Sequence, residues 1–216
     1  TPDSFSDGGL FVDPSSAIAQ AKIMVEEGAG IIDIGGESTR PGAPEVSAED
    51  ELKRVMPVIE ALSGIIKVPI SIDTSKPEVM QKAFDAGASI INDVNALRAD
   101  GAVEMAALLD ADVCLMHMQG TPRTMQNNPS YENVVNDIKV FFQQRIDECQ
   151  SAGIKLSAIT LDPGFGFGKN LGHNIALLKN LSEFHDFGVS ILAGLSRKSM
   201  IGSLLGNKNV DSRMIG

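Results

Sequence analysis

The sequence has few cysteines, no long apolar run and no block of basic residues. Its two cysteines, Cys114 and Cys149, lack the spacing of a metal site, and we interpret them as reduced thiols of a cytoplasmic protein. No apolar run approaches the roughly 18 residues that span a bilayer, and no basic-then-apolar leader opens the chain. These absences exclude a membrane partner and predict a soluble protein.

The balance of charge is acidic. Asp and Glu number 28 against 18 Lys and Arg, so the formal net charge is -10. A surface of that charge repels nucleic acid, and we exclude DNA or RNA as the main partner. The chain has 216 residues, 43% of them hydrophobic and 21% charged, which predicts one α/β domain over residues 1–216.

One pattern recurs along the chain: a short apolar run ends in a carboxylate or an amide, and a loop follows. The polar residues at these run ends are Asp33, Asp73, Asn92 and Asp162. Apolar runs without alternation are typical of parallel strands that are covered on both faces. Since ligands of parallel α/β folds bind outside the carboxyl ends of the strands, we expect these side chains to converge on one site.

Six strands are expected, each separated from the next by a helix, at 31–34, 68–72, 89–92, 113–116, 159–162 and 189–193. Such crossovers imply a parallel sheet, and both a doubly wound sheet and a (β/α)8 barrel fit. The lack of a dinucleotide-binding fingerprint and the polar ends of nearly every strand favour the barrel. Six strands cannot close it, so we predict a (β/α)8 TIM barrel that lacks its first and last strands.

Several helix starts can be placed. Asp13 before Pro14 is a typical N-cap, and Ser47 with Asp50 resembles another helix start. Ser75 with Glu78 predicts a capping box. A long helix is expected over 131–153.

The segment 164–170 is rich in glycine and contains Lys169, which suggests a phosphate-binding loop. The first glycine is one residue too close to the lysine, however, and Asn170 replaces the Ser or Thr that holds magnesium. We reject that interpretation.

The acidic strand ends leave three kinds of site open. Asp33, Asp73 and Asp162 could form a metal cluster, a glycosidase pair, or acceptors for a donor-rich ligand, while Asp73 and Asp93 could simply cap the next helix. Carboxylates beside Asn92 suit a flat heterocycle with adjacent N–H donors, such as an aminopyrimidinone.

Positive charge is concentrated at 196–199, where a helix is expected to begin. Arg197 and Lys198, with Arg40 on another loop, could seat an anion or could be solvated surface charges. The three histidines have no metal spacing; His173 and His185 are assigned to the surface or to packing, and His117 to a pocket wall. Met116 and Phe167 are expected to form apolar walls.

Seven segments, in order, resemble the bacterial dihydropteroate synthase family: 1–9, 35–42, 71–75, 91–93, 114–120, 162–170 and 196–199. The resemblance implies a (β/α)8 barrel that condenses 6-hydroxymethyl-7,8-dihydropterin diphosphate with 4-aminobenzoate, with Mg²⁺ as cofactor. It also implies a homodimer and inhibition by sulfonamides.

The resemblance further implies roles for individual residues. The pterin would be held by Asp73, Asn92, Met116, Asp162 and Lys198. Thr39 and Arg40 would meet the diphosphate, while Phe5, Pro41, Phe167 and Ser199 would shape the aminobenzoate pocket. Asp73, Asp162, Lys198 and Arg40 would be catalytic.

The family differs from this sequence at the ends. Its members carry a magnesium-binding Asn just before the segment that here starts at Thr1, and an Arg-x-His near a last strand, so no metal ligand is assigned in this chain. We expect the 216 residues alone to be poorly stable and inactive, which cooperative melting with unaided turnover would contradict.

Two other functions share some of these sequence features. The pterin-binding barrel of a methyltetrahydrofolate:corrinoid methyltransferase shares the pterin pocket, but the loops 1–9 and 35–42 argue against it. A pterin-binding remnant without activity is disfavoured by the intact Asp73, Asp162 and Lys198. Phe5 and Pro41 match the sulfonamide-sensitive form of the family.

Overall fold

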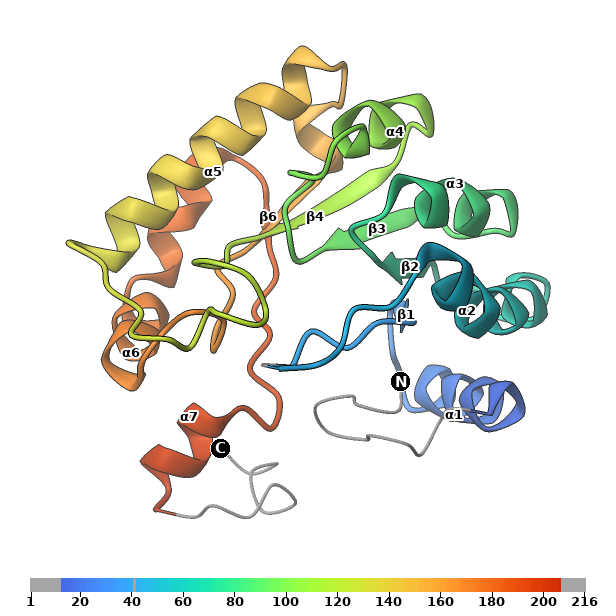
Figure 1. Ribbon diagram of the computed structural model, residues 1–216, viewed down its shortest axis with the longest axis horizontal. Coiled ribbons are helices and arrows are strands. Elements are labelled where there is room, and N and C mark those ends of the chain that lie inside the picture. Colours follow the sequence, from blue (N-terminus) through green and yellow to red (C-terminus); the bar gives the residue numbers. More distant parts are fainter. Residues whose placement is uncertain (1–12, 41, 207–216) are drawn as a thin grey trace.

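The computed structural model describes residues 13–40 and 42–206 (Figure 1). Its strands are β1 (Ile32–Gly35), β2 (Ile70–Asp73), β3 (Ile90–Asp93), β4 (Asp112–Met116), β5 (Ile159–Asp162) and β6 (Ser190–Ile191). Its α-helices are α1 (Pro14–Glu26), α2 (Ala48–Ser63), α3 (Pro77–Asp85), α4 (Ala102–Leu108), α5 (Val134–Ser151), α6 (Leu171–Lys179) and α7 (Ser199–Leu204). Short 3₁₀ helices are η1 (Leu156–Ala158) and η2 (Leu181–Phe187).

The sheet confirms the predicted parallel topology. Its six strands lie in chain order, β1 to β6, and each neighbouring pair is parallel. A doubly wound sheet would reverse its strand order, whereas this order is that of a (β/α)8 barrel. Figure 1 shows α2, α3, α4 and α5 in an arc outside the sheet. Within the described ranges β1 pairs only with β2 and β6 only with β5, so the strands form part of a barrel.

The main core lies between the strands and this outer arc of helices. Ile72, Ile91, Leu115 and Leu161, one from each of four neighbouring strands, are fully buried. They pack in one cluster with residues of the helices, among them Phe142 of α5. Burial of these large apolar side chains is the dominant favourable contribution to folding.

Local sequence signals explain most helix starts. The Asp13 side chain accepts a hydrogen bond from Ser16 N, and Ser47 Oγ accepts one from Asp50 N at 3.1 Å. Both predicted N-caps are confirmed. The helix expected from residue 131 begins at Val134, because Asn133 caps it with bonds from the backbone N–H of 135 and 136.

The predicted capping box at Ser75 and Glu78 is wrong. Helix α3 begins at Pro77 with Lys76 as its N-cap residue, while Ser75 Oγ donates to Asp93 Oδ1. A charge-assisted bond to a buried carboxylate is stronger than the neutral bond in which the hydroxyl would accept from a helix N–H, so the side chain is oriented toward Asp93. Asp93 also accepts from the backbone of Asn95 and Leu97, at 2.8 Å each, and therefore shapes its own turn instead of capping a helix.

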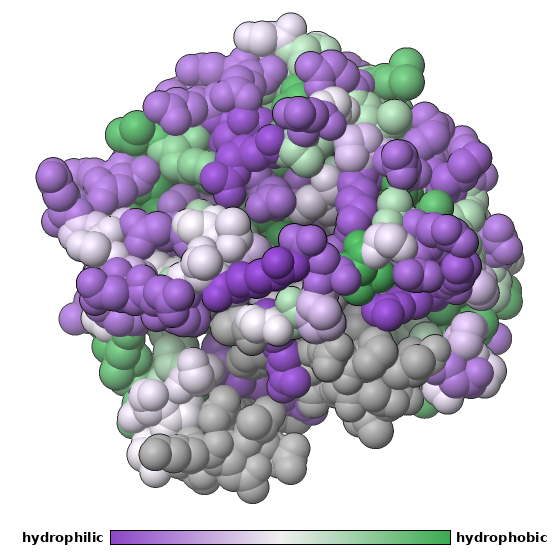
Figure 2. All heavy atoms as spheres, viewed as in Figure 1, coloured by the Kyte–Doolittle hydropathy of each residue, from purple (hydrophilic) through white to green (hydrophobic). Residues whose placement is uncertain are grey.

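The space-filling view in Figure 2 shows where polar and apolar residues lie on one face of the molecule. On the face seen in Figure 2, hydrophilic residues cover most of the described surface and hydrophobic residues are scattered. Among the described residues both cysteines are buried free thiols. None of the helices in residues 13–40 and 42–206 combines the length and the apolar character needed to span a bilayer.

Candidate active site

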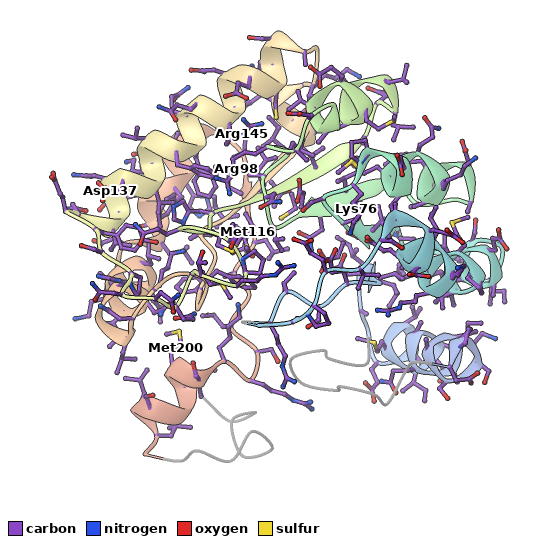
Figure 3. The ribbon with its side chains drawn as sticks, viewed as in Figure 1. Lys76, Arg98, Met116, Asp137, Arg145 and Met200 are labelled. Atoms are coloured by element: carbon purple, nitrogen blue, oxygen red, sulfur yellow. The ribbon has the colours of Figure 1, made fainter. Side chains whose placement is uncertain are left out.

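The strand register brings the predicted polar residues into one layer. Asp73 of β2 pairs with Asn92 of β3, which pairs with Cys114 of β4. Met116 of β4 pairs with Asp162 of β5, two residues nearer the strand ends. Since side chains two residues apart lie on the same face of a strand, all five project to the same side of the sheet. Figure 3 labels Met116 in the middle of this region, at the end of β4.

The carboxylate of Asp33 orients the Asn92 side chain. Its Nδ2 donates to Asp33 Oδ2 at 2.9 Å, across the intervening strand β2. Loss of hydration among the surrounding protein atoms raises the pKa of Asp33, and hydrogen bonds from Ser71 and Asn92 oppose that rise. Asp33 was predicted only as a strand-end acid, and the structure makes it the partner that directs the Asn92 amide.

Asp73 lies in an acidic environment. Burial raises its pKa well above the usual value, and the neighbouring carboxylates of Asp33 and Asp93 raise it further. Opposite β2, Gly35 leaves room for this side chain, because a Cβ there would lie 3.3 Å from Asp73 Oδ2. A cation or an N–H donor beside Asp73 would relieve the repulsion, so the site favours donor-rich or cationic ligands.

Asp162 stands at the end of β5, as the sequence predicted. Its Oδ1 accepts from Gly164 N at 2.8 Å, and the side chain is buried. Burial raises its pKa, against the opposing effects of that hydrogen bond and of Lys198 and Lys169.

Lys198 approaches Asp162 from the end of the chain. Both groups lie near Gly194, since a Cβ built there would be 3.7 Å from Asp162 Oδ2 and 3.9 Å from Lys198 Nζ, at ordinary van der Waals distance. Lys198 Nζ also donates to Phe165 O and lies 4.3 Å from the centroid of the Phe167 ring. Burial lowers the pKa of Lys198, and Asp162 opposes that shift.

An apolar wall adjoins these groups. Met116, Met118 and Met125 form a buried cluster, against which Phe167 packs. The structure thus brings Met116 and Phe167 together, as expected for two pocket walls.

Lys169, rejected as a phosphate-binding lysine, is a residue whose structural role the sequence did not reveal. Its side chain is buried, and Nζ lies 3.0 Å from His117 Nδ1. Burial lowers the pKa of Lys169 to about 7 and that of His117 to about 2. His117 is a packed partner of this lysine. The position of Lys169 after three alternate glycines was the available signal, but glycine spacing alone does not say which way a lysine points.

The remaining predicted residues lie on separate segments. Thr39 and Arg40 belong to the β1–α2 loop, and Ser199 is the exposed first residue of α7. Phe5 and Pro41, with the rest of segment 1–9, lie outside the described residues. His173 belongs to the capping box of α6, and His185 is exposed, so both assignments are confirmed.

The described residues do not supply a metal site of their own. In the ranges 13–40 and 42–206, no three His, Cys, Asp or Glu side chains lie so that they could hold a metal ion. The interpretation of Asp33, Asp73 and Asp162 as a metal cluster is therefore wrong, because these three carboxylates do not together form a metal-binding group.

Comparisons with known proteins agree with this geometry. A family model described as "Pterin binding enzyme" matches residues 1–216. The dihydropteroate synthase of Haemophilus influenzae is 56% identical over all of this chain and 78% of its own length, and that of Escherichia coli is 53% identical over 76% of its length.

Solved structures show the same likeness. A Yersinia pestis dihydropteroate synthase with a sulfonamide drug superposes with a TM-score of 0.97 at 52% identity, over 100% of this chain and 78% of that one. A Xanthomonas albilineans dihydropteroate synthase with 4-aminobenzoic acid superposes with a TM-score of 0.90 at 48% identity, over 99% and 76%. The chain belongs to the pterin-binding enzymes, and within that family to the bacterial dihydropteroate synthases.

Proposed function

We propose that the strand-end groups carry out the dihydropteroate synthase reaction, in which the (dihydropterin-6-yl)methyl group is transferred from diphosphate to the amine of 4-aminobenzoate. The observation that supports this most is the joint placement of Asp73, Asn92 and Asp162 on one side of the sheet. Carboxylate and amide oxygens there match the adjacent N–H donors of an aminopyrimidinone edge.

The pterin would lie among these acceptors. Because Asn92 Nδ2 donates to Asp33, its Oδ1 is the atom of this amide that would accept from the ring. Asp162 accepts from the same edge, Met116 packs on the ring face, and Lys198 donates from the other side.

The transfer itself needs charge stabilisation. The aminobenzoate nitrogen attacks the pterin methylene carbon, the C–O bond breaks, diphosphate leaves with the electron pair, and the amine then loses a proton. Asp73 and Asp162 stabilise positive charge that develops on the methylene as the bond breaks. No covalent nucleophile is required. Cys114 is no candidate, since burial and the nearby carboxylates raise the pKa of its thiol.

The two polar ends of the substrates would meet different loops. Thr39 and Arg40 bind and neutralise the departing diphosphate. Phe167 and Ser199, with Phe5 and Pro41, form the aminobenzoate pocket, where sulfonamides compete. We expect sensitivity to sulfamethoxazole, and turnover that the drug leaves unchanged would contradict this.

Mg²⁺ belongs to the same proposal. Diphosphate oxygens are ligands that magnesium prefers, and a bound ion would neutralise the leaving group. Product formation should stop with EDTA and return with excess Mg²⁺.

We also infer a homodimer, which light scattering would test. The two buried free thiols support a cytoplasmic location, where thiols stay reduced.

The deciding experiment detects dihydropteroate by mass spectrometry from dihydropterin diphosphate, 4-aminobenzoate and Mg²⁺. It uses the chain extended to the length of its relatives, beside Asp73→Asn and Lys198→Ala. Lys53→Ala, at an exposed surface pair, is the control. Product that both site variants strongly reduce supports the proposal. Pterin binding without product would instead favour a methyltransferase barrel or an inactive binding module.

A further inference from the structure

Lys169 closes the β5–α6 loop from inside the protein. Its Nζ lies 2.9 Å from both Gly164 O and Phe167 O, and 3.2 Å from His117 O. A fourth acceptor, His117 Nδ1, lies at 3.0 Å. Protonated lysine has only donors, so in that state the imidazole accepts with this nitrogen, and burial keeps the ring neutral by lowering the pKa of His117 to about 2.

The acceptors come from two segments that are far apart in the sequence and in direct contact. Gly164 has φ +69°, and a Cβ there would lie 2.0 Å from His117 O. A Cβ on Gly168 would lie 2.8 Å from Gln119 O. The glycines therefore let the loop lie on the backbone that follows β4, and the ammonium group joins the two segments.

Two residues of this loop, Phe165 and Phe167, contact groups of the proposed site. Phe167 packs on the cluster of Met116, Met118 and Met125. Phe165 O accepts from Lys198 Nζ. Two neutral donors hold the outer edge of the loop: Gln126 Nε2 to Gly166 O at 2.6 Å, and Tyr131 Oη to Gly168 O at 2.8 Å.

We propose that Lys169 is a positioning residue, whose ammonium group fixes the β5–α6 loop to the end of β4 and thereby places Phe167 beside Met116. This inference rests on the proposed function, since the proposed function is what assigns Phe167 to the aminobenzoate pocket. Lys169 touches backbone carbonyls and an imidazole, so it acts on catalysis through Phe167.

The test is chemical rescue. Lys169→Ala removes three carbons and the nitrogen, and n-propylammonium supplies the same atoms. We expect the amides of Gly166 and Phe167, which donate to Asn174 Oδ1 and Gly164 O, to exchange hydrogen about tenfold faster in the variant. Propylammonium at about pH 6, where an alkylamine is protonated, should restore slow exchange. 1-Propanol, which fills the space without charge, should not.

A catalytic measurement separates positioning from general damage. In Lys169→Ala the KM for aminobenzoate should rise about tenfold, while the KM for the pterin diphosphate changes less than about threefold. Lys155→Ala is the matched control, since Lys155 is 70% exposed and pairs with Asp110 on the surface. It should change neither amide exchange nor KM.

The outcomes distinguish the two proposals. If the wild-type chain forms no dihydropteroate, the proposed function fails, yet loop exchange still reports on Lys169. If Lys169→Ala leaves the loop amides protected, or if 1-propanol rescues as well as propylammonium, the positioning role is wrong. Where Lys169→Ala does not fold, Lys169→Met keeps the stem. Unchanged exchange and an unchanged aminobenzoate KM in that variant would overturn the inference.

Discussion

Two loops at the strand ends are each held by a lysine, but the lysines work in different surroundings. Lys76 lies between the carboxylates of Glu37 and Glu51, and its side chain is 27% exposed. Lys169 is 4% exposed and lies among backbone carbonyls and a neutral imidazole. Figure 3 labels Lys76 after the end of β2, where α3 begins.

The pKa directions follow from those partners. Burial alone would lower the pKa of Lys76, but Glu37 and Glu51 outweigh it and the pKa rises. Lys169 has the distant Asp162 as its favourable charge, and burial lowers its pKa to about 7. The loop with Thr39 and Arg40 is therefore held by the ion pairs of a partly exposed lysine, and the loop with Phe167 by the buried dipoles around Lys169. Salt screens the first kind of tie more than the second.

The largest expected effect comes from disrupting the contact between the β5–α6 loop and His117. Gly164→Ala should lower the free energy of unfolding by about 3 kcal/mol, because the new Cβ meets His117 O and the backbone is left-handed. Gly188→Ala is the matched control: its φ is also +69°, and among the described residues nothing lies within 4 Å of its Cβ. It should cost about 1 kcal/mol in urea unfolding. Equal losses would mean that the contact with His117 is unimportant.

Breaking the ion pairs of Lys76 should cost somewhat less. Lys76→Met leaves the fully buried Glu51 without its cation, and Glu51 Oε1 has no partner among the described residues. We expect a loss of about 2 kcal/mol in unfolding free energy. Lys53→Met, at an exposed pair with Glu49, should change stability by less than about 0.5 kcal/mol. A Lys76 variant as stable as the Lys53 variant would show that the ion pairs contribute nothing.

Replacing Asp73 at the end of β2 should increase stability while it abolishes activity. Its folded-state pKa is raised by burial and by Asp33 and Asp93, so the unfolded chain ionises first as pH rises, and the native state loses stability through that window. Asp73→Asn removes this loss. The variant should be inactive yet about 1 kcal/mol more stable than wild type at pH 8, with a smaller gain at pH 4. A gain independent of pH would contradict the assignment.

The smallest expected effect is on hydrogen exchange, which compares the loop held by Lys76 with the loop held by Lys169. Raising NaCl from about 0.05 to 1 M should speed exchange of the Val46 amide, which donates to Glu37 Oε1, by about threefold. The Phe167 amide, which donates to Gly164 O, should change little. Equal acceleration at both amides would mean that the two loops are held alike.

Much of the fold was predictable because strands and helices leave local signals. The apolar runs with polar ends placed six parallel strands in order, and Ser47 and Asp13 marked helix starts. The Ser75 prediction failed because its hydroxyl donates to Asp93, 18 residues away, and does not accept from a helix N–H. A capping rule considers only neighbours along the chain, so it could not include that competitor.

Apolar periodicity and residue identity are properties of the chain, so they were enough to predict the parallel sheet, the acids and amide at its strand ends, and the family resemblance. Tertiary structure alone decided the pairings that act on the site: Asp33 with Asn92, Lys76 with Glu51, and Lys169 with His117. These partners are 59, 25 and 52 residues apart. Whether a lysine meets carboxylates or carbonyls depends on which segments pack around it, and that packing sets its charge state and the loop it holds.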